Sequence, residues 1–467
     1  MKSSISRRAL LGGLGAIGAS AALAACGATP TPQVIKEVTK EVEKVGKETV
    51  LVEQPTVAAT GQKASVTYWN YMTQMEKIET PILEAFKAAN PDIKVDYQYI
   101  VWDQYWQKLN ATLSAGNPPD VWNTGATYYY EYILRKQLLD LSDLIKRDVD
   151  TSDFHKSTMV GLDLEGRYYG LPRDLVFFVT FFNKDLFDQA GVQPPPLDGN
   201  WTWKDYLEKA VALTSKEGDK TVNWGGEALG DGLTLDQIMF SNGGNPFKGE
   251  FRRDLKGMSA NYDDPISCEV FTYQAELVTK QKTSPPSGEF EGQGNSFLTG
   301  KIAMANRGTW EMVDLKDAKF SWDITTIPKG SQSQRTYGGS DALVISSPAK
   351  DRIEPVWKLA LWVVDAKTSG EFIRGTGLMP ITKSGLNSDL VTGPWGSKNT
   401  NALLAAADTS YGTETLGLGE RLTAEGDELA KMFAGTTAGA EGCGGINKAV
   451  NDAIDRIRTQ FQEVIGA

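Results

Sequence analysis

The stretch Ser65-Val66-Thr67-Tyr68-Trp69 has the β-branched and aromatic residues typical of a strand. Apolar residues at helical spacing follow over Thr80–Asn90, and Ile93-Lys94-Val95-Asp96-Tyr97 alternates as a second strand. An amphipathic helix over residues 105–113 then leads to Val121-Trp122, a third short strand. Strand, helix, strand, helix and strand in this order predict a parallel sheet that is covered by helices.

Similar elements continue along the chain. The pattern predicts further strands at Val176–Phe182, Ala303–Met304 and Ala342–Ile345, and helices at Thr202–Leu213, Val356–Val364, Asp427–Phe433 and Lys448–Val464. No Gly- or Pro-rich linker divides this stretch into two successive domains. We therefore expect two lobes between which the chain passes more than once.

The N-terminus predicts export. Arg7-Arg8 precede a short apolar run that is rich in Gly and Ala and ends in Leu23-Ala24-Ala25-Cys26. This order is typical of a cleaved export signal over residues 1–25, because the apolar run is too short for a membrane span. The paired arginines fit the twin-arginine pattern, and Leu-Ala-Ala-Cys resembles a lipobox. We expect an extracytoplasmic lipoprotein that is anchored to the cell membrane through Cys26.

Residues 26–63 and the net charge bear on the partners of the protein. Residues 27–63 mix Lys, Glu and spaced Val after Pro30 and Pro32, which predicts a solvated spacer; a short coiled coil is the alternative. A formal net charge of -11 repels phosphate backbones, so nucleic acid is not an expected partner. The negative net charge also favours attachment to the membrane through a lipid over attachment through a basic surface. We expect the protein to be a monomer.

The Cys and His residues predict neither a metal site nor a cofactor. Apart from Cys26, the chain has Cys268 and Cys443, which either form a disulfide or remain two buried thiols. His155 is the single histidine, and no Ser or Cys motif adjoins it, which argues against a His-activated nucleophile. Residues 128–130 are three consecutive tyrosines, but neighbouring residues of a helix point in different directions, which argues against an iron site.

Four ordered motifs resemble one family. They are LSAGNPPDV at residues 113–121, GRYYGLP at 166–172, FNKDLF with the following AGV and WTW over 182–203, and FLTGKIAM with GTW over 297–310. These motifs are similar to segments of extracellular solute-binding proteins of the maltose-binding-protein type. Phe182 stands where that family usually has Tyr, and we recognise no motif after about residue 385. The resemblance implies an α/β periplasmic-binding-protein fold with two lobes, each a mainly parallel sheet flanked by helices, and a ligand cleft between them.

The resemblance also implies where the chain changes lobes and what the protein does. The crossings are expected near Pro172–Val176, Ile324–Pro328 and Gly375–Pro380. The first lobe then comprises residues 64–174 and 326–376, and the second lobe comprises residues 175–325 and 377–467. The protein would capture a sugar or oligosaccharide and deliver it to the permease subunits of an ABC importer, without being an enzyme. The alternatives are an extracellular carbohydrate-active hydrolase and a binding protein for a non-sugar solute.

A sugar site needs aromatic faces for C–H patches and fixed polar groups for hydroxyls. The first strand ends in Trp69-Asn70-Tyr71, at the sheet edge where such folds bind ligands, so we expect a ring to stack and Asn70 to hydrogen-bond. The alternative for Trp69 is a place in the core. Asn123 and Thr124 follow the third strand and are expected to face the ligand. Asp120 either accepts hydrogen bonds from the ligand or fixes its own turn.

The other candidates lie at the crossings and in the second lobe. Arg173 and Asp174 stand at the first crossing, where they either contact the ligand or form a salt bridge at the hinge. Trp310 is the strongest aromatic candidate, because the family's Gly-x-Trp segment places an aromatic ring against the sugar. The remaining candidates are Trp224, Asn242, Gly244, Gly339, Asp341 and Trp395.

Overall fold

A computed structural model describes residues 64–125, 128–230, 232–248, 257–293, 295–376, 378–411 and 419–462. The predicted export signal, Cys26 and the spacer lie outside these residues. Within the described residues, no helix is long and apolar enough to cross a membrane. The same residues contain no group of three or more His, Cys, Asp or Glu side chains that could hold a metal ion.

The described residues form strands, α-helices and short 3-10 helices. The strands are β1 (Ala64–Asn70), β2 (Ile93–Tyr99), β3 (Val121–Thr124), β4 (Asp163–Leu164), β5 (Arg167–Tyr168), β6 (Gly170–Pro172), β7 (Val176–Asn183), β8 (Ser215–Glu217), β9 (Lys220–Asn223), β10 (Phe247–Lys248), β11 (Ser259–Ala260), β12 (Met304–Gly308), β13 (Trp322–Thr325), β14 (Thr336–Gly339), β15 (Ala342–Ile345) and β16 (Ser410–Tyr411). The α-helices are α1 (Glu76–Ala89), α2 (Trp102–Ser114), α3 (Tyr129–Leu134), α4 (Ser142–Asp148), α5 (Lys184–Ala190), α6 (Trp203–Leu213), α7 (Gly232–Ser241), α8 (Pro265–Thr279), α9 (Ile353–Val364), α10 (Ala366–Thr376), α11 (Lys383–Leu386), α12 (Asp389–Trp395), α13 (Thr400–Asp408), α14 (Gly419–Phe433) and α15 (Gly439–Gln460). The 3-10 helices are η1 (Thr73–Met75), η2 (Ser296–Thr299), η3 (Thr309–Asp317) and η4 (Ser347–Arg352).

Each strand and helix predicted from the pattern falls on an observed element, although the ends differ. Both C-terminal helices begin earlier than predicted, α14 at Gly419 and α15 at Gly439. Glycines near the start of α15 lower its helix propensity, which conceals this part of the helix in the sequence. A Cβ at Gly442 would lie 2.7 Å from Met432 of α14, so glycine allows the two helices to pack closely. The close packing of α15 on α14 therefore keeps this glycine-containing segment helical.

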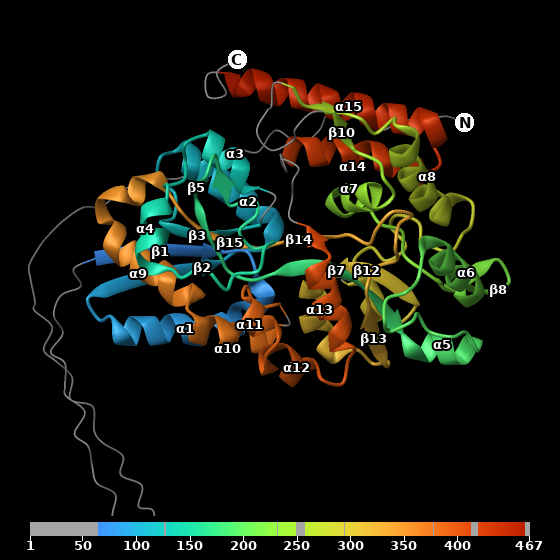
Figure 1. Ribbon diagram of the computed structural model, residues 1–467, viewed down its shortest axis with the longest axis horizontal. Coiled ribbons are helices and arrows are strands. Elements are labelled where there is room, and N and C mark those ends of the chain that lie inside the picture. The colour runs from blue at the N-terminus through green and yellow to red at the C-terminus, as the bar shows by residue number, and fades with distance from the viewer. Residues whose placement is uncertain are drawn as a thin grey trace, which may run out of the picture. The chain divides into compact units, whose positions relative to one another are not determined.

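The first sheet has the strand order β2-β1-β3-β15-β6. Strands β1, β2 and β3 are parallel, which confirms the prediction for residues 65–122, and β15 runs antiparallel to both β3 and β6. Apolar side chains of α1, α4 and α9 pack on one face of this sheet, and those of α2 and α3 pack on the other. Figure 1 shows the sheet on the left, with α1 on one side and α2 and α3 on the other.

The second sheet is centred on β7 and lies on the right in Figure 1. Strands β12, β13 and β14 each pair with β7 in antiparallel orientation, and only the pair of β14 with β16 is parallel. The expectation of a mainly parallel sheet is therefore wrong for the second sheet. Between β7 and β12 the chain makes a long excursion through α5, α6, α7 and α8, so no strand–helix–strand sequence reveals the direction of pairing.

Both faces of β7 are buried, which explains its continuous apolar sequence. Phe177, Val179 and Phe181 point to a core formed with η3, α12 and α13. Phe178 points to a second core with α7, α8, α14 and α15, and Phe182 to a third with α5 and α6. Alternate side chains of one strand thus join helical layers on both faces of the sheet.

The chain passes between the two sheets at segments that are hydrogen-bonded to one another. The first passage, Arg173–Leu175, joins β6 to β7, and the second, Ser340–Asp341, joins β14 to β15. The Arg173 amide donates to the Asp341 carbonyl at 2.9 Å, and the Leu175 amide donates to the Met379 carbonyl at 2.8 Å. Strand pairing therefore places the second passage after Gly339 and corrects the expected position near Ile324–Pro328. The other lobe boundaries remain predictions.

A disulfide joins Cys268 of α8 to Cys443 of α15, with 5.5 Å between the Cα atoms. This resolves the alternative that the sequence leaves open. The two residues are separated by 175 positions, so the bond closes a long loop of the unfolded chain. It ties the C-terminal helix to the layer that covers the second sheet.

We predict that the double variant Cys268→Ala/Cys443→Ala folds with a free energy of unfolding about 2–4 kcal/mol lower than that of the native protein. The physical reason is that the variant's unfolded chain regains the freedom of the open loop. Urea unfolding followed by circular dichroism measures this difference. The reduced native protein is the control and should match the variant; equal stability of the variant and the oxidised protein would contradict the prediction.

Candidate functional site

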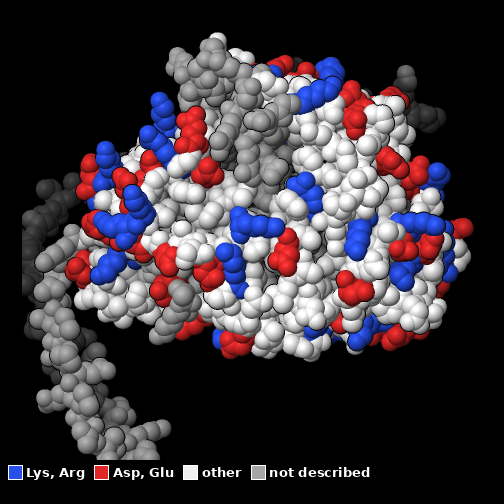
Figure 2. Space-filling model, viewed as in Figure 1, with Lys and Arg blue, Asp and Glu red and all other residues white. Residues whose placement is uncertain are grey.

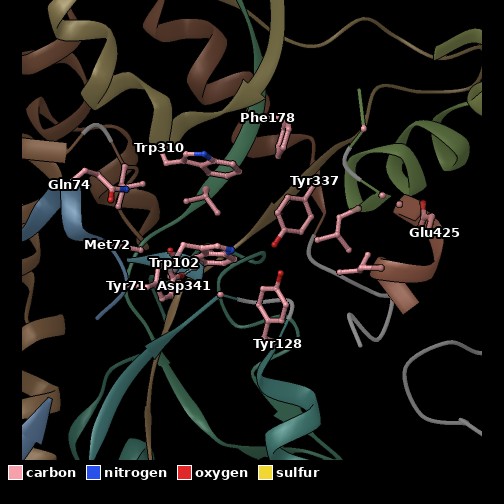
Figure 3. Close-up of a pocket in the computed structure, with 18 of the residues that line it drawn as sticks. Tyr71, Met72, Gln74, Trp102, Tyr128, Phe178, Trp310, Tyr337, Asp341 and Glu425 are labelled. Carbon is pink, nitrogen blue, oxygen red and sulfur yellow. Dashed lines mark hydrogen bonds between the residues drawn. The ribbon is translucent and has the colours of Figure 1, made fainter. Parts of the chain in front are cut away.

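A cavity of about 550 Å³ lies between the two sheets. Residues that follow β1 form part of its wall, together with residues of β7, β14, η3, α7 and α14. The lining comprises Tyr71, Met72, Gln74, Met75, Trp102, Gly125, Tyr128, Val176, Phe178, Gly230, Gly232, Leu233, Trp310, Tyr337, Asp341, Leu378, Leu422, Glu425, Gly426 and Leu429. Figure 3 shows the labelled side chains converging on one space from several elements.

Aromatic rings on the side of the first sheet form one wall of the cavity. Tyr71 contacts Trp102 edge to face, with 4.9 Å between ring centroids, and Trp102 contacts Trp106 in the same way at 5.1 Å. Trp106 packs beneath Tyr128 at 4.6 Å. Trp102 remains 44% exposed, so its indole is available at the mouth of the cavity. We call Tyr71, Trp102 and Tyr128 the first aromatic wall.

Phe178, Trp310 and Tyr337 form the second aromatic wall. The Phe178 ring contacts Trp310 at 5.4 Å and Tyr337 at 6.3 Å, in both cases edge to face. A Cβ at position 308 would lie 2.1 Å from the Trp310 ring, so Gly308 makes this indole position possible. This contact explains the glycine of the Gly308-Thr309-Trp310 motif. Figure 3 shows the Tyr337 and Tyr128 hydroxyl groups pointing toward each other from the two walls.

Asp341 places a carboxyl group in the cavity wall. The Tyr71 hydroxyl donates to Asp341 Oδ1 at 2.8 Å, and the Asp341 amide donates to Asp174 Oδ1 at 3.0 Å. Burial raises the pKa of Asp341 to about 6, although the hydrogen bond from Tyr71 opposes the rise. Burial and the nearby Asp341 charge also raise the pKa of Asp174 well above its ordinary value. Two acidic groups thus meet where the chain crosses between the sheets.

A buried ion pair holds the first crossing against the end of β1. Arg173 donates to Glu79 Oε1 at 2.6 Å and to the Tyr68 hydroxyl at 3.0 Å. The Glu79 carboxylate also accepts from Asn70 Nδ2 at 2.7 Å and from the Tyr99 hydroxyl at 2.6 Å. Both charges are almost completely buried, and each compensates the other. The Arg173 guanidinium is therefore directed away from the cavity, into the first sheet's core.

A second buried network supports the wall on the side of α14. Arg421 pairs with Glu425 at 2.9 Å and with Asp236 of α7 at 3.3 Å. The Tyr262 hydroxyl lies 3.2 Å from an oxygen of each carboxylate, so its single proton can be donated to either. A Cβ at Gly232 would lie 2.7 Å from the Glu425 carboxyl group, so this glycine allows α7 to approach α14. These contacts fix Glu425 at the cavity's edge.

Three of the residues predicted from the sequence line the cavity, namely Tyr71, Trp310 and Asp341. The other candidates lie elsewhere. Trp69 is 7% exposed and packs in the core between the first sheet and α2, with Lys108 Nζ 4.5 Å from the centre of its ring. Asn70 bonds to Glu79, and its Oδ1 accepts from the Met72 amide at 2.9 Å, so it shapes the turn that carries Tyr71.

The predicted polar candidates of the first lobe have structural partners or are buried. Asp120 accepts from the Thr67 amide of β1 at 2.9 Å and pairs with Arg352 of η4, so its carboxylate joins distant segments of the first lobe and does not line the cavity. Arg173 forms the salt bridge that was the alternative to ligand contact. Asn123 and Thr124 are fully buried in β3, and neither lines the cavity.

The candidates of the second lobe, apart from Trp310, also lie outside the cavity lining. Trp224 and Trp395 are buried in the core on one face of β7. Asn242 holds a loop by accepting from the Ser331 amide at 2.9 Å. Gly244 donates to the Met239 carbonyl at the end of α7, and Gly339 pairs with Val176 within the second sheet.

Sequence reasoning missed most of the cavity lining. Trp102 comes soon after β2, so the rule that ligands bind at the carboxyl ends of strands could have found it. Phe178 and Tyr337 lie within strands, where the sequence does not show which face a side chain takes. Leu422 and Leu429 come from α14, in the part of the chain without a recognised motif.

Comparison with known proteins matches the chain to one family. The family model described as bacterial extracellular solute-binding protein matches residues 69–369. The diacetylchitobiose-binding protein DasA of Streptomyces coelicolor is 26% identical over 65% of this chain and 69% of its own length. The sn-glycerol-3-phosphate-binding periplasmic protein UgpB of Salmonella paratyphi A is 24% identical over 70% of this chain and 77% of its own length.

A solved structure confirms the predicted fold class. The ABC substrate-binding protein Lmo0181 of Listeria monocytogenes, solved in complex with cycloalternan, superposes with a TM-score of 0.75 at 24% identity. The superposition covers 86% of this chain and 99% of that protein. The chain therefore has an α/β periplasmic-binding-protein fold, with two mixed sheets flanked by helices.

We predict that Asp341→Asn changes how stability depends on pH. Because the pKa of Asp341 rises to about 6 on folding, its carboxyl favours the folded state at low pH, and this contribution is lost as the pH rises through about 6. The free energy of unfolding of the variant, relative to that of the native protein, should therefore increase by on the order of 2 kcal/mol between about pH 4 and pH 7. Urea unfolding at each pH measures the difference. The control Asp455→Asn removes a 69% exposed carboxylate of α15 and should leave the pH profile unchanged; a shared profile for all three proteins would refute the prediction.

Proposed function

Because the chain belongs to the bacterial extracellular solute-binding protein family, we propose that it captures a sugar or oligosaccharide for an ABC importer. Members of this family bind solutes, so the protein is not an enzyme, and the hydrolase alternative is set aside. The observation that carries the sugar proposal is the pair of aromatic walls on opposite sides of one cavity. Ring faces on two sides suit the C–H patches of a sugar.

Polar groups among the rings supply partners for hydroxyls. The hydroxyls of Tyr71, Tyr128 and Tyr337, the Gln74 amide and the Asp341 carboxyl group are all part of the lining. A cavity of about 550 Å³ is in the range of sites that enclose small molecules. Such a combination of apolar area and a few fixed polar groups is typical of a specific ligand site.

The position of the cavity supports capture by closure. The first aromatic wall lies on the side of the first sheet and the second on the side of the second sheet. The chain passes between these sheets at residues 173–175 and again at residues 340–341. A ligand that contacts both walls favours the arrangement in which the walls are close, so binding shifts the population toward a closed form. We propose that permease subunits recognise this form.

A glycerol phosphate is the second candidate, because UgpB is among the relatives. A bound phosphate needs cationic side chains or a helix N-terminus directed at it. Among the described residues that line the cavity, none is Lys, Arg or His. The first residues of α7, Gly232 and Leu233, are part of the lining, but the Glu425 carboxyl group lies against Gly232, and Asp341 is a second acidic group in the wall. This lining favours a sugar over a phosphate ester.

For the location, we propose that Cys26 carries a lipid that anchors the protein outside the cell membrane. On the face in Figure 2, blue Lys and Arg side chains are interspersed with red Asp and Glu side chains among the described residues. A mixed surface of this kind suits attachment through lipid, and it gives no reason to expect a nucleic acid partner.

We predict that Trp310→Ala weakens sugar binding at least tenfold, because the variant loses a ring face of the second aromatic wall. A thermal-shift panel of mono- and oligosaccharides first identifies the ligand, since a ligand at 100 times its Kd adds about 2.7 kcal/mol to stability. Calorimetry then gives the Kd of each variant. The control Trp310→Phe keeps an aromatic face and should stay within about threefold of the native Kd. Unchanged affinity in Trp310→Ala would remove this residue from the site, and silence across the panel would refute sugar binding.

We predict that Cys26→Ala moves the protein from the membrane fraction to the soluble extracytoplasmic fraction, because the variant lacks the residue that carries the lipid. Cell fractionation with immunoblotting measures the distribution. Replacing Arg7 and Arg8 by Lys tests the export route separately, since that variant keeps Cys26. Retention of the Cys26→Ala variant in membranes would contradict the lipid anchor.

A further inference from the structure

Asp341 is an acidic group that the crossing between the sheets brings to the cavity. It lies between β14 and β15, and the Tyr71 hydroxyl holds its Oδ1 at 2.8 Å. Gly125, which also lines the cavity, borders the same carboxyl group and adds no side chain. A ligand group in the cavity can therefore reach Asp341 directly.

A second carboxyl group lies behind Asp341. Asp174 accepts the Asp341 amide through Oδ1, and its Oδ2 is buried without a hydrogen-bond partner in the described part of the chain. The neighbouring Arg173 guanidinium pairs with Glu79 and stacks on the Phe372 ring at 4.2 Å. Arg173 is thus engaged with Glu79 and Phe372, and among the described residues neither Asp174 nor Asp341 has an ion-pair partner.

The rest of the lining suits a positive charge as well. Among the described lining residues there is no basic side chain, and rings surround the space next to Asp341. Aromatic faces attract cations through their quadrupole, most strongly where water is excluded. An anionic ligand would instead face Asp341 without compensation, at a cost that grows in a cavity of low dielectric.

We propose that the cavity selects a sugar that carries a positively charged amino group, which Asp341 binds between the two aromatic walls. This inference rests on the proposed function, because it names the class of sugar that the same site takes. The ring faces contact the sugar's C–H patches, and the ammonium group donates hydrogen bonds to the carboxylate. Asp174 adds negative potential from behind Asp341.

Binding of an ammonium group at Asp341 would change the number of protons that the protein holds. The titratable and charged groups that face Asp341 are Asp174 and Arg173 of the first crossing and Tyr71 after β1. Since the pKa of Asp341 is raised to about 6, the carboxyl pair retains part of a proton in mildly acidic solution. A bound ammonium group favours the carboxylate form, so its binding releases protons.

Three disaccharides with the same β-1,4-linked skeleton test the proposal with purified protein. At C2 of each ring, chitobiose carries an amine, N,N′-diacetylchitobiose an uncharged acetamide, and cellobiose a hydroxyl group. Titration calorimetry at about pH 5.5, where the sugar amines are already protonated and Asp341 still holds most of its proton, gives the Kd and, from two buffers of different ionisation enthalpy, the number of protons released. We expect chitobiose to bind at least tenfold more tightly than cellobiose, and to release protons where cellobiose does not.

Matched variants assign the effect to Asp341. Asp341→Asn keeps an acceptor for the Tyr71 hydroxyl and removes the charge, so it should bring the Kd ratio of cellobiose to chitobiose below about threefold. It should also abolish the proton release. Asp455→Asn makes the same change on the exposed side of α15 and should keep the native ratio. An unchanged ratio in Asp341→Asn would overturn the proposal.

The outcomes separate this inference from the proposed function. If cellobiose, N,N′-diacetylchitobiose or another neutral saccharide of the panel binds as tightly as chitobiose or more tightly, the inference is wrong and the protein is still a sugar-binding protein. If no saccharide of either kind binds, the proposed function fails and the inference fails with it.

Discussion

The Glu79 carboxylate is the point on which the cavity depends. It is buried, and it is held by Arg173 from the first crossing, by Asn70 from the end of β1 and by two tyrosine hydroxyls. Removing one partner would leave a charge buried without compensation, so the network acts as a unit. Tyr71 follows Asn70, and Asp174 follows Arg173 and holds the Asp341 amide. The ion pair of Glu79 and Arg173 therefore positions Tyr71 of the first aromatic wall and the acidic pair Asp174 and Asp341. Neither Glu79 nor Arg173 lines the cavity.

The sequence predicts the first sheet more fully than the second, for a physical reason. In residues 64–124 the strands and helices alternate, and their periodicity is a local property that the sequence displays directly. The second sheet is assembled from β7 and strands more than a hundred positions further along the chain, so its pairing depends on contacts between distant segments. The apolar run of β7 shows that the strand is buried on both faces, but it contains no information about the direction of its neighbours.

The residues of the cavity also divide into those that a local sequence pattern reveals and those that only contacts between distant segments reveal. Tyr71 follows one predicted strand, Asp341 directly precedes another, and Trp310 belongs to a motif of the family resemblance, so the sequence could identify all three. Asp120 has the same local signature as Asp341, a carboxylate in a turn beside a strand, and only the partners Thr67 and Arg352 show that its role is structural. Phe178 and Tyr337 were missed because a buried strand exposes no pattern that distinguishes a cavity face from a core face. Side-chain partners, and not residue type, separate the ligand-facing groups from the structural ones.

The position of β15 has a consequence for the order of folding during synthesis and export. This strand lies between β3 and β6 in the first sheet, although it is made of residues 342–345. Until that part of the chain is available, β3 has an open edge, and an open edge is a template for pairing with the wrong strand. A chain that emerges N-terminus first must therefore wait for three quarters of its length before its first sheet can close. Such a protein needs either protection of that edge by other factors during translocation or a route that carries it across the membrane after folding is complete.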